Sequence, residues 1–219
     1  MLVKKNASIL LPILALLCSC EDVGNDYRYP SVITDYACII TDAYGSPESL
    51  LLDNGLEYQI AFSDEYRNTH EQLPTYKADT TYRVISIYEL GTDSVAHIYS
   101  MAETVSNIPT PLRNGEILHQ DPVYLQSCWQ SGGYLNMVIE LKALKGEHHI
   151  GFVDTTLEGM HGKEFTFYHN ANNDIESYRQ KLYASIPLAP FKNNLQQGDT
   201  LRIVVNTYDK GVIQQEFVM

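Results

Sequence analysis

The sequence predicts an all-β protein in which a first β module is followed by an antiparallel β-sandwich. Short runs rich in β-branched and aromatic residues recur along the chain, and clusters of Gly, Asn, Asp and Pro separate them. Pro109-Thr110-Pro111 interrupts this pattern, and proline removes a backbone donor and restricts the residue before it. We therefore place the domain boundary there, with residues 28–108 in the first module and residues 109–219 in the second.

The first module is expected to contain five strands and one polar interruption. The predicted strands lie at Val32–Tyr44, on each side of the Asn54-Gly55 pair, at Tyr82–Glu89 and at Ser94–Met101. Asn-Gly between two strand-like runs indicates a hairpin, because both central residues of a type I′ turn need a positive φ. Residues 64–81 are polar and predict a long loop or a single helical turn.

The second module is expected to contain seven short strands, a number typical of a β-sandwich. They lie at Pro122–Trp129, Tyr134–Lys142, His148–Asp154, Glu164–His169, Tyr178–Pro187, Thr200–Tyr208 and Val212–Met219. Residues 174–182 also allow the start of a helix, although the Ser and Tyr residues there argue against it.

The N-terminus predicts a secretory leader that ends at a lipid-modified cysteine. A basic start precedes an apolar run over residues 7–17, which is shorter than the roughly 20 residues that span a bilayer. Residues 17–20, Leu-Cys-Ser-Cys, resemble a bacterial lipobox, and this resemblance implies cleavage before Cys20 and acylation of Cys20. Cys18 offers a competing cleavage site, but Ser19 supplies the small residue that precedes a cut at Cys20.

Lipidation at Cys20 predicts a membrane location. We expect residues 1–19 to be removed as a signal peptide and residues 20–27 to form an acidic tether. Several acyl chains, at about 0.8 kcal/mol per buried methylene, hold a protein stably on a membrane. The acidic residues after Cys20 resemble those of Bacteroidetes lipoproteins exported to the cell surface; a solvated tether without sorting content is the alternative. The expected location is the outer membrane, facing the periplasm or the cell exterior.

The charge balance excludes one class of partner. The full chain has a net charge of −12, and loss of the leader's two lysines makes that of the mature protein −14. Such a surface repels phosphate backbones and anionic lipid head groups, so nucleic acid is not an expected partner. Membrane contact is expected through the lipid anchor alone.

Cys38, Cys128 and Trp129 are expected core residues, since each lies in an apolar, strand-like run. Free cysteine is among the most buried residue types, so we expect both thiols to be unpaired, with a disulfide outside the cytoplasm as the alternative. Trp129 and the 16 tyrosines also allow an exposed aromatic surface that binds a sugar or a protein. Tyrosine is, however, generally favoured on half-buried strands.

The sequence contains no motif that assigns a catalytic residue or a cofactor. Gln130-Ser131-Gly132-Gly133 lacks the leading glycine of a nucleophile elbow and indicates a turn. Residues 159–164 are similar to a phosphate-binding loop, but the glycines are too close together and Glu164 stands where Ser or Thr is needed. A pair of glycosidase carboxylates is defined by its distance in the fold, which the sequence does not provide.

Two patterns suggest metal binding, and neither assigns a ligand. His148-His149 lies in a predicted strand, where adjacent side chains point to opposite faces and do not share an ion. Asn170-x-Asn172-x-Asp174 matches the first ligands of a calcium loop, but Ile175 replaces the required glycine and Lys181 replaces the final Glu. A turn capped by its own Asn and Asp side chains is the better interpretation.

The chain resembles the NigD-like lipoproteins of Bacteroidetes, through several short motifs in a consistent order. These motifs are Leu52-Asp53-Asn54-Gly55, Arg83-Val84, Asp121-Pro122 leading to Trp129, Tyr134-Leu135-Asn136, and Phe167-Tyr168-His169-Asn170 with Asp174. The resemblance implies an N-terminal OB-like barrel over residues 28–108 and a C-terminal β-sandwich over residues 109–219. It also implies a possible role in bacteriocin immunity, and it carries no catalytic residue to this chain.

Together these observations predict a non-catalytic, lipid-anchored envelope protein that binds a protein or a glycan. The binding residues are not identified by the sequence. The alternative is an extracytoplasmic hydrolase of glycan or peptide, with acidic residues of the second module as acid and base. Close carboxylates in a cleft favour the hydrolase, whereas an exposed groove without them favours the binding protein.

Overall fold

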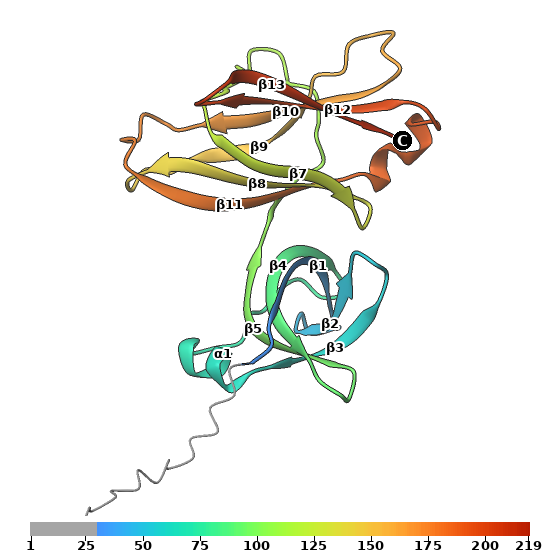
Figure 1. Ribbon diagram of the computed structural model, residues 1–219, viewed down its shortest axis with the longest axis vertical. Helices are drawn as coiled ribbons and strands as arrows, with labels where there is room; N and C mark the ends of the chain where they lie inside the picture. Colours follow the sequence, from blue (N-terminus) through green and yellow to red (C-terminus); the bar gives the residue numbers. More distant parts are fainter. Residues whose placement is uncertain (1–29) are drawn as a thin grey trace, which may run out of the picture. The chain divides into compact units, whose positions relative to one another are not determined.

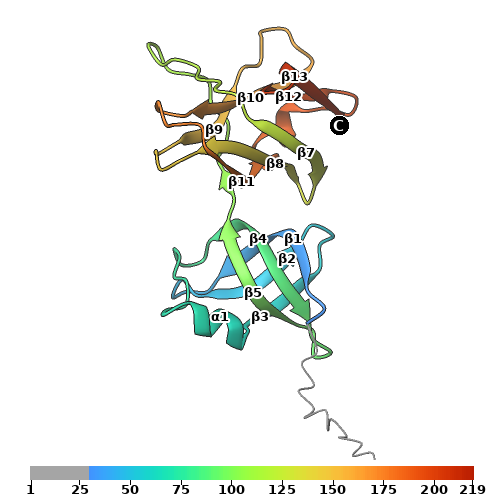
Figure 2. The same cartoon turned by 60° about the vertical axis from the view of Figure 1, so that its left-hand side comes forward.

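The structure of the protein, a computed structural model, describes residues 30–219 and is almost entirely β (Figure 1). The predicted leader and tether, with Cys20, lie outside the described residues. Residues 31–219 belong to one unit, in which a closed barrel is followed by two four-stranded sheets (Figure 2). The predicted all-β class, with a barrel followed by a sandwich, is confirmed. Among the described helices, none has the length and apolar character needed to cross a membrane.

The first module is a five-stranded barrel with β1 at Ile33–Thr41, β2 at Pro47–Leu52, β3 at Glu57–Phe62, β4 at Thr81–Leu90 and β5 at Val95–Glu103. The strands close in the order β1–β2–β3–β5–β4. β3 and β5 pair in parallel, and the other neighbours pair in antiparallel fashion. A five-stranded closed barrel of this kind is OB-like.

The polar stretch at residues 64–81 contains one short helix, α1 at Asp64–Thr69, followed by a loop. Ser63 caps the helix, because its hydroxyl accepts the Tyr66 N–H at 3.1 Å. Tyr66 is buried and packs into the barrel core, which fixes the helix between β3 and β4. The predicted helical turn is therefore present.

The hairpin predicted at Asn54-Gly55 is present, but its turn differs from the predicted type I′. Gly55 has a φ of +86°, whereas Asn54 does not have a positive φ. Gly55 N–H donates to the Leu52 carbonyl at 2.9 Å, and Leu52 N–H donates to the Leu56 carbonyl at 2.8 Å. The result is a longer loop with one left-handed residue, a hairpin form in which only the glycine needs a positive φ.

The second module is a sandwich of two four-stranded sheets, in the orders β13–β12–β10–β9 and β6–β11–β8–β7. The strand bounds are β6 at Val105–Ser106, β7 at Tyr124–Ser131, β8 at Tyr134–Ala143, β9 at His149–Asp154, β10 at Gly162–Asn170, β11 at Tyr178–Pro187, β12 at Thr200–Thr207 and β13 at Gly211–Val218, with a 3₁₀ helix, η1, at Ala189–Asn194. Most neighbours are antiparallel, as expected, but β10–β12 and β6–β11 pair in parallel. No helix forms at residues 174–182: residues 174–177 lie in a loop and residues 178–182 begin β11.

β6 is a strand that the sequence did not predict, because two residues carry no periodic pattern. It pairs with β11 and so belongs to the sandwich, four residues before the predicted start at 109. Pro109-Thr110-Pro111 lies in the connection from β6 to β7, where Thr110 forms an isolated bridge with Val153.

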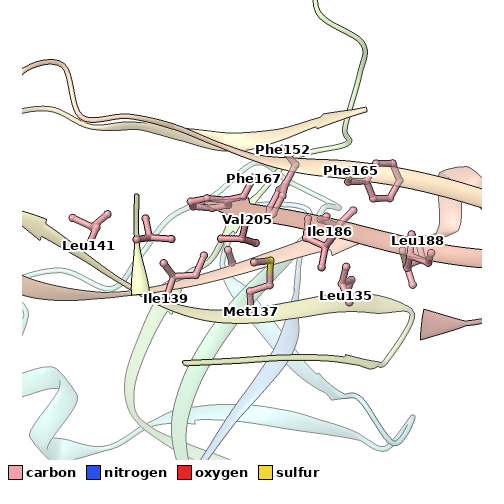
Figure 3. Packing of buried hydrophobic residues seen from close by; sticks show 14 of the residues in the cluster. Leu135, Met137, Ile139, Leu141, Phe152, Phe165, Phe167, Ile186, Leu188 and Val205 are labelled. Atoms are coloured by element: carbon pink, nitrogen blue, oxygen red, sulfur yellow. The ribbon is translucent and has the colours of Figure 1, made fainter. Parts of the chain in front are cut away.

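Each module has its own hydrophobic core. In the sandwich, Phe152, Phe165 and Phe167 of one sheet pack toward Leu135, Met137 and Ile139 of the other (Figure 3). The barrel core is formed by Ala37, Ile39, Leu50, Phe62, Tyr66, Val84, Tyr88, Ala96 and Ile98. Two separate cores are expected of two separate modules.

Cys38 and Cys128 are both unpaired, as predicted. Cys38 is buried, and Cys128 is partly buried against the sandwich core. Burial raises the pKa of the Cys128 thiol to about 12. That thiol is therefore neutral near neutral pH and is a packing group rather than a nucleophile.

Candidate functional site

Arg83 lies at the centre of a polar cluster that joins the barrel to the sandwich. Arg83 lies on β4 and is 5% exposed. It forms a bidentate ion pair with Asp53 in the β2–β3 loop. Arg83 Nη1 lies 2.5 Å from Asp53 Oδ1, and Nη2 lies 2.9 Å from Oδ2. The same Nη2 donates to Asn136 Oδ1, on β8 of the sandwich, at 2.9 Å. This fork geometry fixes the orientation of both partners.

The sandwich side of this cluster completes the hydrogen bonds of Asp53. Asn136 Nδ2 donates to Ser131 Oγ at 2.9 Å, and Ser131 Oγ donates to Asp53 Oδ2 at 2.5 Å. The Tyr134 ring covers the guanidinium, with its centroid 4.2 Å from Arg83 Cζ. Burial acts to raise the pKa of the Asp53 carboxyl, but hydrogen bonds from Arg83 and Ser131 outweigh burial and lower it. Asp53 is therefore an ionised partner of Arg83.

Trp129, which was expected in the core, lies half-buried beside this cluster. Its indole N–H donates to Ser131 Oγ at 3.1 Å, and its ring packs edge-to-face on Tyr36 of β1, with centroids 5.3 Å apart. The prediction of a core Trp is wrong because this side chain fills the contact between the modules, which strand periodicity does not reveal.

The cluster around Arg83 is a structural clamp. Most of the motifs that carry the family resemblance meet here, through Asp53, Arg83, Trp129, Tyr134 and Asn136. Ser131 Oγ donates to the Asp53 carboxylate, but both oxygens of that carboxylate are held by Arg83, and the polar atoms of Asn136 are also occupied by their neighbours.

A second cluster, the histidine pair, lies within the sandwich. His148 precedes β9 and His169 lies on β10, and His148 Nδ1 is 2.8 Å from His169 Nε2. His148 Nε2 lies 3.2 Å from Asp174 Oδ2, and His169 Nδ1 lies 2.9 Å from the Asp121 main-chain oxygen. His169 is 1% exposed, so this chain of hydrogen bonds is screened little by solvent.

The calcium-loop pattern at residues 170–174 forms a turn. Asn170 Oδ1 accepts the Asn172 N–H at 2.8 Å, and Asn172 has a φ of +49°. The Asp174 carboxylate faces the protein, where it accepts the Leu144 N–H at 2.7 Å and contacts His148. Within residues 30–219, no group of three or more His, Cys, Asp or Glu side chains is placed to hold a metal ion.

The other two sequence patterns also have structural roles. Gly132 and Gly133 form the β7–β8 turn, and Gln130 and Ser131 end β7, where Ser131 belongs to the clamp around Arg83. Glu164, from the pattern similar to a phosphate loop, lies on β10 and pairs with Arg202 of β12 at 3.0 Å. His149 is exposed at the start of β9, so the structure joins His148 to His169 rather than to its neighbour.

An open groove of about 700 Å³ lies on the outer face of β9 and β10. Gly151 of β9 and Tyr168 of β10 are register partners and form its floor, alternating with the core residues Phe152 and Phe167. A Cβ atom on Gly151 would lie 3.1 Å from Asn107 Oδ1. Because residue 151 has no side chain, the Asn107 amide can lie close against β9 at this point.

The connection from β6 to β7 forms the wall of the groove and is fastened to the free edge of β9. Asn107 Oδ1 accepts the Phe152 N–H at 3.0 Å, and Asn107 Nδ2 donates to the Phe152 carbonyl at 3.1 Å. The Thr110 carbonyl accepts the Asp154 N–H at 3.1 Å. This amide and carbonyl pairing covers an edge that would otherwise be exposed.

The lining of the groove combines apolar and polar groups. Ile117 is 69% exposed on its rim, and His119 packs edge-to-face on Tyr168 with ring centroids 5.9 Å apart. Among the described residues that line the groove, Glu116 carries the only carboxylate, and it accepts the Arg113 N–H at 2.8 Å. The groove therefore has the form of a binding site, with no pair of carboxylates.

Sequence reasoning did not find the groove, because its residues form no motif. It is built from a connection that folds back over two strands, with the Asn107 amide close against Gly151. The signals in the sequence were the Pro109-Thr110-Pro111 break and the apolar Ile117 in a region without predicted strands.

The sandwich matches a known domain family. Residues 105–219 match the family described as the NigD-like C-terminal beta sandwich domain. The match begins at the first residue of β6, in agreement with the pairing of β6 to β11. The comparison with curated proteins gave no match.

Solved structures are similar over both modules. The crystal structure of a NigD-like immunity protein from Bacteroides caccae is 29% identical, with a TM-score of 0.70, and covers 88% of this chain and 99% of that one. A protein of unknown function from Bacteroides vulgatus is 16% identical, with a TM-score of 0.61, over 85% of this chain and 91% of that one. The second likeness is one of fold alone.

Proposed function

This chain belongs to the NigD-like family, and we propose that it is a non-catalytic binding protein of the bacterial envelope, anchored by a lipid at Cys20. The observation that carries the proposal is the groove over Gly151 and Tyr168. Its volume of about 700 Å³ lies in the range of known ligand sites, roughly 300–1,000 Å³.

The composition of the groove supports binding rather than hydrolysis. Acid–base hydrolysis of a glycan uses two carboxyl groups about 5–10 Å apart. Glu116 is the single carboxylate among the described lining residues, and the partly buried Asp53 and Asp174 are paired with Arg83 and His148. The groove thus lacks the arrangement that would favour the hydrolase.

We propose a polypeptide rather than a glycan as the partner. The exposed rim residue Ile117 is aliphatic, and aliphatic groups favour burial against another apolar side chain. The Bacteroides caccae neighbour is described as an immunity protein, which supports a toxin as the polypeptide. An outer-membrane anchor would place the groove where such a toxin arrives.

Replacing Cys20 by Ala is expected to move the protein from the membrane fraction to the soluble fraction. The acyl chains on Cys20 are the proposed anchor, and the net charge of −14 for the mature chain gives no attraction to anionic lipid. The measurement is fractionation of cells that express the full-length chain, with Cys128→Ala as the control. Retention of Cys20→Ala in the membrane, with detergent still needed for release, would contradict the anchor.

Gly151→Leu is expected to reduce protection by disturbing the wall of the groove and occupying part of its space. The φ of Gly151 lies outside the left-handed region, so the backbone accepts a side chain there, and a leucine would displace the Asn107 amide that forms part of the groove wall. Sensitive Bacteroides cells that express the wild-type chain are challenged with medium from a bacteriocin-producing strain. We expect the wild type to protect the cells and Gly151→Leu to lose at least tenfold in protection.

Ser127→Leu is the matched control, because it adds a leucine at an exposed site on β7, outside the groove lining. It should protect as the wild type does, and thermal unfolding should show that both variants are folded. Equal protection by Gly151→Leu and the wild type would show that the groove is not needed for protection. Turnover of a sugar on a glycan array, lost on Glu116→Gln, would favour the hydrolase.

A further inference from the structure

The geometry of the histidine pair determines how many hydrogens its ring nitrogens carry. The chain of three hydrogen bonds ends on the Asp121 carbonyl at one side and on the Asp174 carboxylate at the other. A carbonyl and an ionised carboxylate only accept, so each of the three bonds needs a hydrogen from a ring nitrogen. Three hydrogens on two imidazole rings are one more than two neutral rings carry.

The positions of these hydrogens follow from the ends of the chain. Backbone hydrogen bonds, chiefly from Leu144, lower the pKa of the Asp174 carboxyl to about 2, so Asp174 is ionised. His169 donates from Nδ1 to the Asp121 carbonyl, and burial lowers the pKa of His169, which keeps that ring neutral and leaves its Nε2 as an acceptor. The contact of His148 with the Asp174 carboxylate places the third hydrogen on the His148 side of the His148–His169 bond.

We propose that His148 and His169 hold one shared extra proton and act as a pH-dependent latch within the sandwich. Addition of a fourth hydrogen would place two N–H groups against each other across 2.8 Å. Loss of the third hydrogen would leave either two bare nitrogens facing each other between the rings or the bare Nε2 of His148 against the Asp174 carboxylate. Either change breaks one of the three bonds, so the latch is closed only in the singly charged state.

The latch holds the β8–β9 turn and the β6–β7 connection together. Asp174 receives the N–H groups of Leu144 and Lys145, at 2.7 and 3.4 Å, and so ties the β8–β9 turn. His169 donates its main-chain N–H to the His119 carbonyl at 3.0 Å, and His119 lines the groove. An effect of pH on a ligand in the groove rests on the proposed function, whereas the latch itself does not.

The charged groups around the pair favour a single positive charge. Asp174 contacts His148, and the Asp121 carboxylate lies near His169 and accepts the Ala171 N–H at 2.7 Å. Lys181 of β11 shares a small cavity of about 180 Å³ with His148 and opposes the charge, but Lys181 is exposed and screened. The carboxylates of Asp174 and Asp121 therefore lie near the histidine pair and favour its positive charge.

The latch predicts a maximum of stability near the pKa of a free histidine, about 6.5. Below that pH both histidines of the unfolded chain are charged, the unfolded state binds more protons, and stability falls as the pH falls. Above it the unfolded histidines are neutral, the folded pair binds one more proton, and stability falls as the pH rises. A difference of one proton changes the unfolding equilibrium about tenfold per pH unit.

The direct test is ¹⁵N NMR of the imidazole rings in the full-length protein without ligand, near pH 7. We expect the His148 ring to have hydrogens on both nitrogens and the His169 ring to have one, on Nδ1. Two neutral rings, or two charged rings, would overturn the proposal. Because no groove ligand is present, this result is independent of the proposed function.

A mutational test uses urea unfolding at a series of pH values about the free histidine pKa. We expect the wild type to show the maximum, and His148→Gln to lose the fall in stability on the alkaline side. His149→Gln is the matched control, since His149 is the exposed neighbour, and it should keep the wild-type profile. An unchanged profile in His148→Gln would overturn the latch, and if that variant does not fold, the NMR result decides.

Discussion

Arg83→Met is expected to destabilise the protein by about 3 kcal/mol. Methionine keeps much of the volume of arginine but leaves the Asp53 carboxylate without its cation, and removal of one partner of a buried pair costs about 3–5 kcal/mol. The Asp53 side chain is 20% exposed, so we expect the lower end of that range. The measurement is the free energy of unfolding in urea.

Two further variants separate this clamp from an ordinary ion pair. Arg83→Met combined with Asp53→Asn should be less destabilised than Arg83→Met alone, because no charge is then left unpaired. Arg179→Met is the matched control, since Arg179 is exposed and lies 3.5 Å from Glu140, and such surface pairs contribute roughly 0–1 kcal/mol. Equal losses for Arg83→Met and Arg179→Met would show that the clamp does not join the modules.

Phe167→Ala is expected to cost about 3–5 kcal/mol, the typical loss for a buried phenylalanine. Phe167 is 1% exposed and packs edge-to-face on Phe152, with ring centroids 5.7 Å apart, in the centre of the sandwich core (Figure 3). The cavity left by the ring lies under the strand that carries Tyr168 and His169. Urea unfolding again measures the loss.

Tyr168→Ala is the neighbouring control for Phe167→Ala. Tyr168 lies on the opposite face of β10, where it packs on His119 and forms the floor of the groove. We expect a loss of about 1 kcal/mol, typical of one aromatic pair, together with reduced protection against the toxin. A larger loss of stability for Tyr168→Ala than for Phe167→Ala would contradict the assignment of the two faces.

The class of fold and most strands followed from local sequence. Alternation along β4 and β8, and turn residues between runs, are properties of neighbouring residues and are visible without a structure. The turn at Asn54-Gly55 was located from local sequence and differed only in its type, whereas the short β6 depends on a partner far along the chain, β11. Long-range contacts of this kind leave no local pattern.

The candidate sites were predicted less well, for the same reason. His148 was compared with its neighbour His149, whereas its partner in the fold is His169 on another strand. Asp174 was correctly interpreted as a turn residue, but its bond to His148 joins loops that are distant in sequence. The groove wall is held by Asn107, whose amide lies against Gly151 and bonds to Phe152, and this contact between segments distant in sequence forms no motif.

Site-specific photo-crosslinking in living cells tests the central claim, that the groove binds a polypeptide, most directly. A photoreactive amino acid at Ile117, 69% exposed on the groove rim, is compared with one at Val212, 61% exposed on β13 at the opposite edge of the sheet from β9. In protected cells challenged with the toxin-containing medium, we expect a polypeptide adduct from Ile117 and none from Val212. An adduct from Val212 and none from Ile117, with protection intact, would contradict the account.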